Sequence, residues 1–529
     1  MTMPTAEVPT VDLADHARDA LSDRLDAATL RRAPASIAAV VERGHVVAVA
    51  AHGEPRRDGA VTARSTVFRI ASMSKSFLAA TALALRDEGV LDLHAPAAQY
   101  VPGLDLARFG DDSPRLTLDA LLSNRGGLAE DNAWGDEHLG SSRAELAALV
   151  AAGLPLAAHP GAEYHYSNLG ISFLGRAIEA VTGRDVEDVV RERLLDPLGL
   201  RATRADAGLY DEHADLAAGF RTFDDGLTFR PEPYVGSGAL ACIGSLFSTV
   251  DDIATWMHFL GSAFDETSAP SHLLSAASRR EMQTARTMIP VSERSSPGRE
   301  LDGAGYGYGL VVEQDRRFGR MVLHAGGLPG FSSHMRWHPA SGIGVVVFGN
   351  SDAYGAGAVA ADVLQGVLTR VRAPAAIVRP WAATWAAAAR IDGLLADGRP
   401  LSEASDVLAR NVLRDVPEDV RRRRLSEALA ETGPVRTDAA PFAARVLSAA
   451  DRSALRWVVP CERGALVCDV HMIGLATPLV QEFAVHVADA TGMKPRGETA
   501  RATDHHRVAP PPGPHPFVTL RHRTDPEGR

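Results

Sequence analysis

The spacing of apolar and polar residues along the chain predicts a mixture of helices and strands. Residues 11–27 carry the pattern of an amphipathic helix, and residues 35–53 contain two apolar runs that meet at Arg43-Gly44. Two apolar runs joined by a short turn are typical of adjacent strands. Residues 65–72 form a third apolar run. The chain is therefore expected to begin with one helix followed by short strands.

The middle of the chain is dominated by helical patterns. Helices alternate with loops over about 113–300, strand patterns return between Tyr306 and Asn350, and a helix follows over about 357–372. Strands at both ends of this region, with helices between them, predict one sheet in which N-terminal and C-terminal strands pair. The predicted fold class is α/β of the mixed α+β kind. It comprises an antiparallel sheet flanked by helices, with a helical subdomain.

The composition changes near residues 371–380, which we interpret as a linker. Helices and then apolar strands follow, so residues 381–492 are predicted to form a small accessory α+β domain. Residues 493–529 are rich in proline and polar residues and are predicted to be disordered. The main domain is then expected to span residues 1–375.

Charge and hydropathy restrict the partners and the location. The net charge of −11 argues against nucleic acid or an anionic membrane as a partner, because both require a basic surface. The first residues lack the basic and apolar stretches of a secretory signal, and no apolar run reaches the length of a membrane span. A cytoplasmic location is therefore expected.

Cysteines and histidines give no sign of a metal or cofactor. The three cysteines form no CxxC pair, and in a cytoplasmic chain they are expected to be reduced. His505, His506 and His515 lie in the proline-rich tail without a cysteine or carboxylate partner. We therefore predict neither a metal site nor a cofactor.

Lysine is almost absent from the chain. Of the 55 lysine and arginine residues, only Lys75 and Lys494 are lysines. Lys75 follows Ser72 by three residues, in a helix predicted to run to about Glu88, so both side chains project from one face. A serine hydroxyl needs an adjacent base to become a nucleophile, and lysine can be that base because burial lowers its pKa, whereas arginine stays protonated. Ser-x-x-Lys alone also recurs by chance.

A second motif, Tyr-x-Asn, is formed by Tyr166 and Asn168 just before a predicted helix. A tyrosine near a lysine can share its proton and pass one to a leaving group, and the asparagine amide can orient the lysine or bind a carbonyl. The alternative is a buried tyrosine beside an asparagine that caps the helix.

A third motif, His324-x-Gly326-Gly327, lies on a predicted strand. Glycines there allow a substrate backbone to approach closely. The backbone N–H of Gly327 would form an oxyanion hole with that of Ser72. The alternative is a histidine at the end of a strand, followed by a glycine turn.

In this order the three motifs resemble those of the serine β-lactamase and penicillin-binding-protein superfamily. The closest likeness is to its class C-like branch of esterases, D-aminopeptidases and carboxypeptidase-like hydrolases. The segments LLSNRGGL, HPGAEYHYSNLG and GYGYGLVV also resemble family segments, and the likeness covers about residues 15–372. It implies a five-stranded antiparallel sheet with flanking helices.

The resemblance also implies a role for each residue. Ser72 would be the acylated nucleophile, Lys75 its general base and Tyr166 the acid and base partner. The residues implied to bind substrate or its oxyanion are Asn168, His324, Gly326 and Gly327.

Two departures from the family pattern bear on the substrate. His324 stands where the third motif has lysine, and a neutral imidazole offers a substrate carboxylate little charge near pH 7, so we expect a poor β-lactamase. Asn124 and Arg125 stand where the family usually has His-Thr. Arg125 is either a solvated loop charge or a carboxylate clamp, and Trp134 either lines an acyl pocket or merely packs.

The sequence thus predicts a serine hydrolase that forms an acyl-enzyme on Ser72 and cleaves an ester, amide or D-peptide bond in a small molecule or peptide. An acyltransferase or a peptide-cyclising thioesterase would form the same acyl-enzyme and is the alternative. A penicillin-binding sensor or a pseudoenzyme is less favoured. Assembly into a homo-oligomer, or a protein partner bound through the C-terminal domain, is left open.

Overall fold

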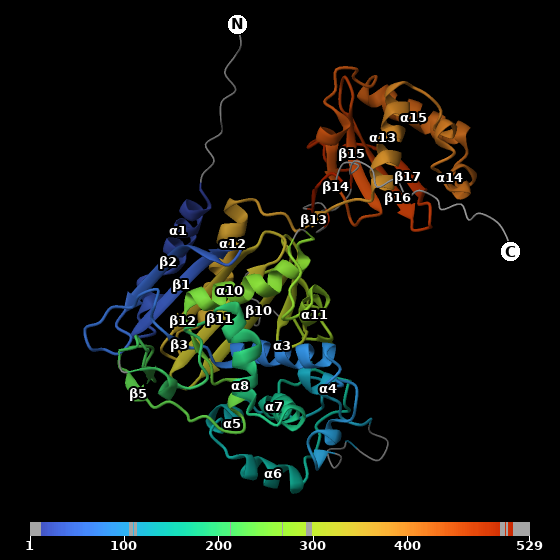
Figure 1. Cartoon of the computed structure of the whole chain (residues 1–529). Coiled ribbons are helices and arrows are strands. Elements are labelled where there is room, and N and C mark those ends of the chain that lie inside the picture. Colours follow the sequence, from blue (N-terminus) through green and yellow to red (C-terminus); the bar gives the residue numbers. More distant parts are fainter. Residues whose placement is uncertain are drawn as a thin grey trace, which may run out of the picture. The chain divides into compact units, whose positions relative to one another are not determined.

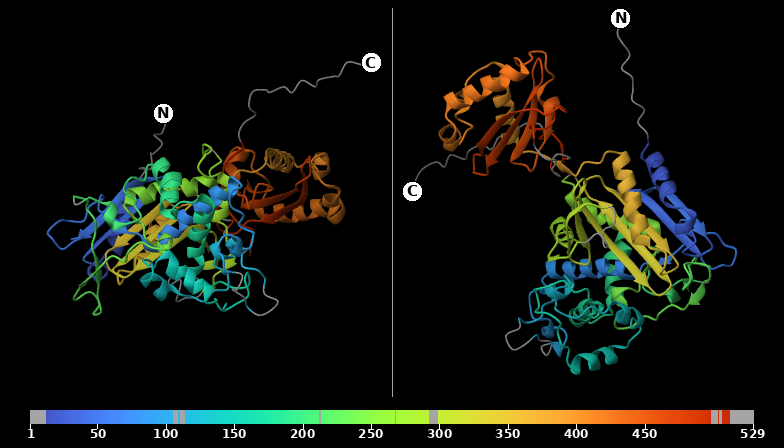
Figure 2. Two further views of the ribbon diagram at one scale, coloured as in Figure 1. Left: turned by 60° about the horizontal axis from the view of Figure 1, so that its bottom comes forward. Right: turned by 180° about the vertical axis from the view of Figure 1, so that it is seen from behind.

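The computed structural model describes residues 12–104, 109, 114–211, 213–266, 268–291, 299–497, 503 and 506–511. The chain forms two compact units, Met1–Ala373 and Pro374–Arg529, which are described separately (Figures 1 and 2). Within the described part of the chain, no helix has both the length and the hydropathy needed to cross a membrane.

The first unit is built around an eight-stranded antiparallel sheet in the order β2-β1-β12-β11-β10-β9-β8-β7. Its strands are β1 (Ala35–Glu42), β2 (His45–Gly53), β7 (Thr287–Met288), β8 (Leu301–Tyr306), β9 (Val311–Asp315), β10 (Gly319–Leu328), β11 (Phe331–His338) and β12 (Ile343–Gly349). The N-terminal β1 pairs with β12 along its length, with Ile37 opposite Phe348. The predicted fold class is confirmed, although the sheet has eight strands in the described residues rather than five.

Helices cover both faces of this sheet because its central strands are apolar on both sides. In β12, Val345 and Val347 face one hydrophobic cluster, and Val346 and Phe348 face the other, as the alternation of side chains along a strand requires. Helices α1 (Leu13–Arg24) and α12 (Ala356–Arg370) cover the first face, and α10 (Val250–Gly261) packs on the second (Figures 1 and 2).

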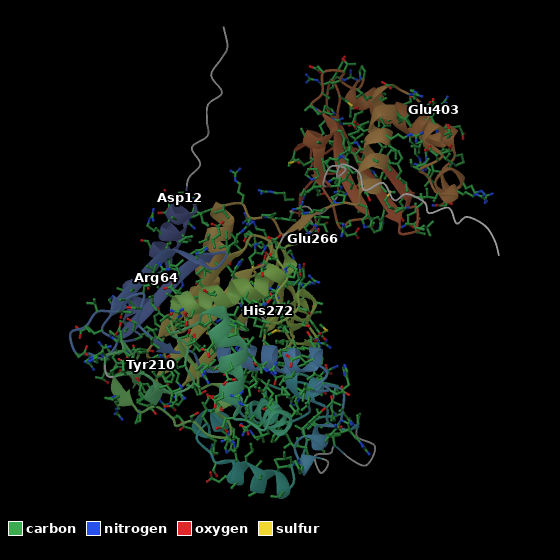
Figure 3. All side chains as sticks on the ribbon, viewed as in Figure 1. Asp12, Arg64, Tyr210, Glu266, His272 and Glu403 are labelled. Atoms are coloured by element: carbon green, nitrogen blue, oxygen red, sulfur yellow. The ribbon has the colours of Figure 1, made fainter. Side chains whose placement is uncertain are left out.

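The helical subdomain is inserted between β2 and β7, together with two small strand pairs. Its helices are α3 (Ser74–Asp87), α4 (Leu118–Leu122), α5 (Asn132–Glu137), α6 (Arg143–Ala151), α7 (Asn168–Thr182), α8 (Val186–Val190), α9 (Asp196–Leu198) and α11 (Ala276–Met282). The paired strands are β3 (Phe68–Arg69) with β6 (Phe247–Ser248) and β4 (Gly219–Arg221) with β5 (Arg230–Glu232). A short helix α2 (Ala27–Leu30) precedes β1. Before β3, Arg64 (Figure 3) donates to Asp251 at the start of α10 with an N···O distance of 2.7 Å.

The second unit contains a four-stranded antiparallel sheet with helices around it. Its elements are α13 (Ala382–Ala396), α14 (Arg410–Asp415), α15 (Glu418–Thr432), β14 (Val446–Ser448), β15 (Ala454–Pro460), β16 (Ala465–Ile473) and β17 (Leu479–Val487). Trp457 and Cys468 lie opposite each other at the centre of its core and are fully buried. Cys242, Cys461 and Cys468 are all free and buried.

Two short strands lie in segments that the sequence predicted to be irregular. β13 (Ala376–Val378) falls in the predicted linker and pairs in parallel with β18 (His506–Val508), which falls in the predicted disordered tail. His506 Nδ1 also donates to Ala449 O across 2.8 Å, so this short strand is paired within a segment that the sequence predicted to be disordered. Backbone pairing to β13 supplies order that the local composition does not reveal. His505, His515 and most of the remaining tail lie outside the described residues.

Candidate active site

Ser72 lies in a tight turn between a strand and a helix. After β3, Ala71–Met73 form a single 3₁₀ turn, and α3 begins only at Ser74. The sequence placed the start of the helix at Ser72, so the helix begins slightly later than predicted. Ser72 is buried with 7% of its surface exposed, which puts its hydroxyl in a nearly dry environment.

The backbone of this turn is held in an unfavourable conformation. Ala71 has a φ of 49°, in the left-handed region that residues with a Cβ rarely adopt. The preceding residue, Ile70, is fixed on both sides. Its N–H donates to Leu246 O at 2.9 Å, and its carbonyl accepts from Ser333 Oγ at 2.7 Å. These contacts stabilise a strained turn that presents Ser72.

Lys75 is the nearest basic group to the Ser72 hydroxyl. Its Nζ lies 2.8 Å from Ser72 Oγ and donates to Ile243 O at 2.9 Å. Burial lowers the pKa of Lys75 to about 7, and the nearby carboxylates of Asp136 and Asp131 only partly oppose this shift. A large fraction of Lys75 is therefore neutral near pH 7 and able to accept a proton.

Tyr166 joins the same cluster from the loop before α7. Lys75 Nζ lies 5.1 Å from the centre of the Tyr166 ring. Burial raises the pKa of Tyr166 far above its ordinary value, and a hydrogen bond with Ser72 opposes that shift without reversing it. Tyr166 consequently keeps its proton at neutral pH, so Lys75 is the stronger candidate for the resting base.

Asn168 is the first residue of α7 but it is not the helix cap. Ser167 caps the helix, accepting from Gly170 N at 2.9 Å. Asn168 Nδ2 donates to Asn132 Oδ1 at 3.1 Å, and Asn168 Oδ1 is buried without a hydrogen-bond partner among the described residues. The structure therefore brings Asn168 to α5 and gives it no hydrogen bond to Lys75.

Sequence reasoning missed Asp131, the carboxylate that holds the start of α7. Asp131 accepts from Asn168 N at 2.6 Å, Leu169 N at 2.9 Å and Ser167 Oγ at 3.0 Å. Gly135, further along, has no room for a side chain, because a Cβ there would lie 2.6 Å from Asn168 Cβ. Acidic and glycine residues in a loop gave no signal that they pack against a motif over thirty residues later.

His324 lies on β10 opposite Met335 and is buried. Its Nδ1 lies 2.6 Å from Ala325 O, which can only accept, so Nδ1 carries the proton and Nε2 accepts from Tyr306 OH at 3.1 Å. Burial lowers the pKa of His324 to about 3, and the charge of Lys75 adds to the effect. His324 is neutral, and Tyr306 is a site residue that sequence reasoning did not identify.

The two glycines of the third motif have different surroundings. A Cβ at Gly326 would lie 2.2 Å from both Ile70 O and Ser333 Oγ, so only glycine lets β10 approach the Ser72 turn. A Cβ at Gly327 would meet nothing within 4 Å. Gly327 thus borders open space beside the turn.

Arg125 fits neither of the alternatives that the sequence left open. It is ion-paired with the buried carboxylate of Asp119, and its Nε donates to Ser123 Oγ at 3.0 Å. Asp119 also accepts from Tyr308, so Arg125 neutralises a structural carboxylate.

Asn124 accepts from Ser167 N through Oδ1 at 3.2 Å and thereby holds the loop that carries Tyr166.

Two charged groups near the cluster were not predicted. The pKa of Asp136, on α5, is raised to about 6 by burial, against the opposing charge of Lys75. Arg69 is buried, donates to Val235 O at 3.2 Å and has an Nε without a partner in the described structure.

Trp134 is 37% exposed and stacks on His138. No group of three or more potential metal ligands occurs among the residues described.

Comparison with known proteins places the chain in a family. A family model described as Beta-lactamase matches residues 21–368. The chain is 29% identical over 315 residues to the unguisins hydrolase ungD of Aspergillus violaceofuscus, a match that covers 54% of this chain and 53% of that protein. The chain thus spans about half the length of this relative.

Two further relatives extend the comparison. The D-alanyl-D-alanine-carboxypeptidase/endopeptidase AmpH of Escherichia coli is 25% identical over 319 residues, covering 59% of this chain and 78% of AmpH. The octameric penicillin-binding protein homologue from Pyrococcus abyssi superposes with a TM-score of 0.54 at 19% identity, covering 90% of this chain and 99% of that one, which shows a shared fold. Because the family model spans more than half of the sequence, the chain belongs to the beta-lactamase family.

Proposed function

We propose that this protein is a serine hydrolase that cleaves an ester, amide or D-peptide bond through an acyl-enzyme on Ser72. The observation that carries the proposal is the buried Lys75, whose Nζ lies 2.8 Å from Ser72 Oγ and whose pKa is lowered to about 7. The hydrolase names of the relatives, unguisins hydrolase and D-alanyl-D-alanine-carboxypeptidase/endopeptidase, support the reaction class.

Acylation begins with proton transfer from Ser72 to neutral Lys75. Ser72 Oγ then attacks the substrate carbonyl carbon, and the C=O electron pair moves to oxygen. The backbone N–H groups of Ser72 and Gly327 stabilise this oxyanion. Collapse of the tetrahedral intermediate breaks the bond to the leaving group, which takes a proton from Tyr166, and Lys75 returns a proton to Tyr166.

Deacylation repeats these steps with water as the nucleophile. Neutral Lys75 takes a proton from water as it attacks the acyl carbonyl. When the tetrahedral intermediate collapses, Tyr166 gives its proton to the departing Ser72 Oγ and is reprotonated by Lys75. Asn168 positions the acyl donor, and Gly326 lets β10 pack against the turn that carries Ser72. The acid product and the free Ser72 hydroxyl complete the cycle.

The neutral His324 favours substrates without a carboxylate at the position that the third motif recognises. Its Nε2 is occupied by Tyr306 OH and its Nδ1 by Ala325 O, so it offers no charge to an anion. We therefore expect efficient turnover of small neutral esters or amides and weak hydrolysis of penicillins.

The test is intact-mass spectrometry after brief exposure to p-nitrophenyl butyrate, with nitrophenol release followed in parallel. A mass gain of one butyryl group on the wild type and none on Ser72→Ala, with a burst and then steady release, is the expected result. Equal adducts on both proteins, or no release that depends on Ser72, would contradict the proposal. Addition of an alcohol then measures how the acyl group partitions between transfer and hydrolysis.

A further inference from the structure

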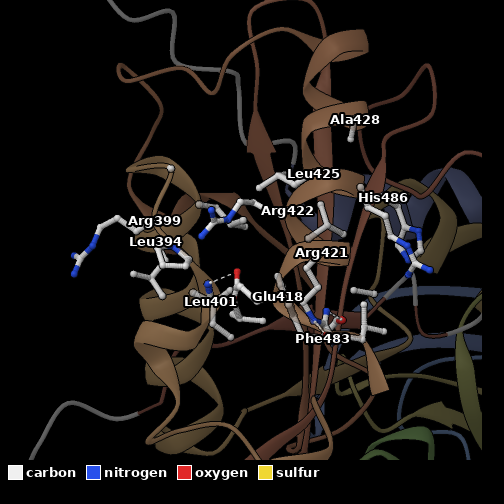
Figure 4. Close-up of a pocket in the computed structure, with 18 residues that line it drawn as sticks. Leu394, Arg399, Leu401, Glu418, Arg421, Arg422, Leu425, Ala428, Phe483 and His486 are labelled. Carbon is white, nitrogen blue, oxygen red and sulfur yellow. Dashed lines mark hydrogen bonds between the residues drawn. The ribbon is translucent and has the colours of Figure 1, made fainter. Parts of the chain in front are cut away.

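The second unit contains a cavity of about 210 Å³ that the proposed hydrolysis does not use. It lies between α13, α15 and β17 (Figure 4). Its walls are mainly apolar. The apolar side chains that line it are those of Ile391, Leu394, Leu395, Pro400, Leu401, Val416, Leu425, Ala428, Phe483, Ala484 and Val485. A cavity with such walls favours an apolar group over water.

The cavity exists because α15 packs loosely. Of the 15 residues in this helix only Thr432 is buried, and Leu425 and Ala428 on its inner side are half-buried. The helix carries the run Arg421–Arg424, and long charged side chains cannot fill an apolar space under a helix without losing hydration. A gap therefore remains between α15 and the sheet.

Hydrogen bonds nevertheless fix α15 above this gap. The two carboxylate oxygens of Glu418 accept from Leu401 N at 3.2 Å and Ser402 N at 2.9 Å, which ties the start of the helix to the segment after α13. Arg421 donates to Val412 O at 2.8 Å and to Phe483 O at 3.1 Å. The cavity is thus preformed. Glu418 and Arg421 already use their side chains in these hydrogen bonds.

The remaining charges around the cavity are positive. Arg422 and Arg424 line it and form no ion pair or hydrogen bond among the residues described, whereas Arg399 is ion-paired with Glu403. Figure 4 shows Arg422 extending from α15 into the space between α15 and α13, while Arg399 points outward. The only acidic residue of the lining is Glu418.

We infer that this cavity binds a monocarboxylate with an unbranched apolar tail, of the fatty-acid class. The tail would lie among Leu394, Leu425 and Phe483, and the carboxylate would meet the guanidinium of Arg422. The apolar walls favour a ligand with an apolar tail. The guanidinium of Arg422 has unused hydrogen-bond donors, and it can bind a carboxylate through two hydrogen bonds. The small volume favours a tail of medium length over a long one.

The experiment is calorimetric titration of the full chain with decanoate below its micelle-forming concentration. Decanoate is expected to bind at one site, with decan-1-ol and butanoate both weaker because the first lacks the charge and the second most of the tail. Arg422→Gln should weaken binding about tenfold or more, the usual effect of losing a charge-assisted pair. The matched control is Arg423→Gln, which removes the same charge from the neighbouring residue outside the cavity lining and should leave the affinity unchanged.

Ala428→Trp tests the location, because a large side chain there would fill the cavity. It should abolish decanoate binding, and circular dichroism would confirm that the variant is folded. Retained binding in folded Ala428→Trp would place the acid elsewhere, for example at Ser72, and overturn the inference. Three other results would also overturn the inference, whether or not Ala428→Trp folds. They are no binding of decanoate to the wild type, equal affinity for decan-1-ol, and equal losses of affinity in Arg422→Gln and Arg423→Gln.

Discussion

Helices α3 and α15 are almost equal in length, with 14 and 15 residues, but their packing differs greatly. Twelve residues of α3 are buried, including Lys75, whereas α15 buries only Thr432. The chemistry of their basic residues follows this difference. Lys75 loses hydration, its pKa falls to about 7, and it can act as a base. Arg422 is exposed, and its guanidinium is suited to hold an anion.

Under the proposed mechanism, the comparison gives a physical reason for the one lysine of the first unit, Lys75. A buried guanidinium remains protonated, so it can pair with a carboxylate but cannot take a proton from serine. Asp119 uses arginine in this way, since both Arg125 and Arg286 neutralise it. Burial alone therefore does not make a base; the residue must also have a pKa that burial can bring near neutrality.

The largest expected effect on activity comes from replacing the lysine at position 75 with arginine. Lys75→Arg keeps the positive charge but removes the proton acceptor, so kcat/KM for p-nitrophenyl butyrate should fall by about 10³-fold or more. The measurement is steady-state hydrolysis, with intact mass to follow acylation of Ser72.

The chain offers a matched control for that substitution. Lys494→Arg changes the only other lysine, in the second unit, and should leave kcat/KM within about twofold, as expected for a change outside the site. Activity of Lys75→Arg within a factor of ten of the wild type would contradict the role of Lys75 as base.

A smaller effect tests the difference in packing directly. Leu83→Ala on α3 removes a fully buried side chain and should lower the free energy of unfolding by about 3 kcal/mol, through lost burial and the cavity left behind. Leu425→Ala on α15 removes a half-buried side chain and should cost about 1 kcal/mol or less. Urea unfolding followed by tryptophan fluorescence measures both. Equal losses would mean that α15 packs as tightly as α3.

The sequence was sufficient for those parts of the site that depend on local spacing. Ser72 and Lys75 are one turn apart, so their contact follows from the helical repeat. Pairing of β1 with β12 followed from apolar runs at both ends of the main unit. His324 was identified from a strand pattern, and its neutral state is what the imidazole pKa favoured.

The sequence was not sufficient where long-range packing determines a partner. Tyr306 meets His324 only through the register of the sheet, and Asp131 meets Asn168 only because α5 folds back onto α7. Arg125 was misjudged because its partner, Asp119, looks like any polar residue of a short helix. The strand β18 was missed because its order comes from pairing with β13.

The smallest predicted effect concerns the charge that surrounds the buried lysine. In the proposed mechanism Lys75 is a base only when neutral, so kcat/KM should rise with pH through an apparent pKa near 7. Asp136 stabilises the protonated form, and its removal in Asp136→Asn should lower the pKa of Lys75. The acidic limb of the profile should therefore move to lower pH, by about half a unit to one unit.

Glu137→Gln is the matched control for this shift, because it removes a carboxylate from the next residue of α5, and Glu137 is not among the charges that act directly on the pKa of Lys75. The acidic limb should stay in place in this variant, and pH profiles of kcat/KM for a neutral ester compare the three proteins. Loss of the acidic limb in Asp136→Asn would mean that the titrating group is Asp136 itself, whose pKa is about 6, rather than Lys75. The contrast between the two helices would then lose its chemical basis, because burial would not be what prepares Lys75 to accept the Ser72 proton.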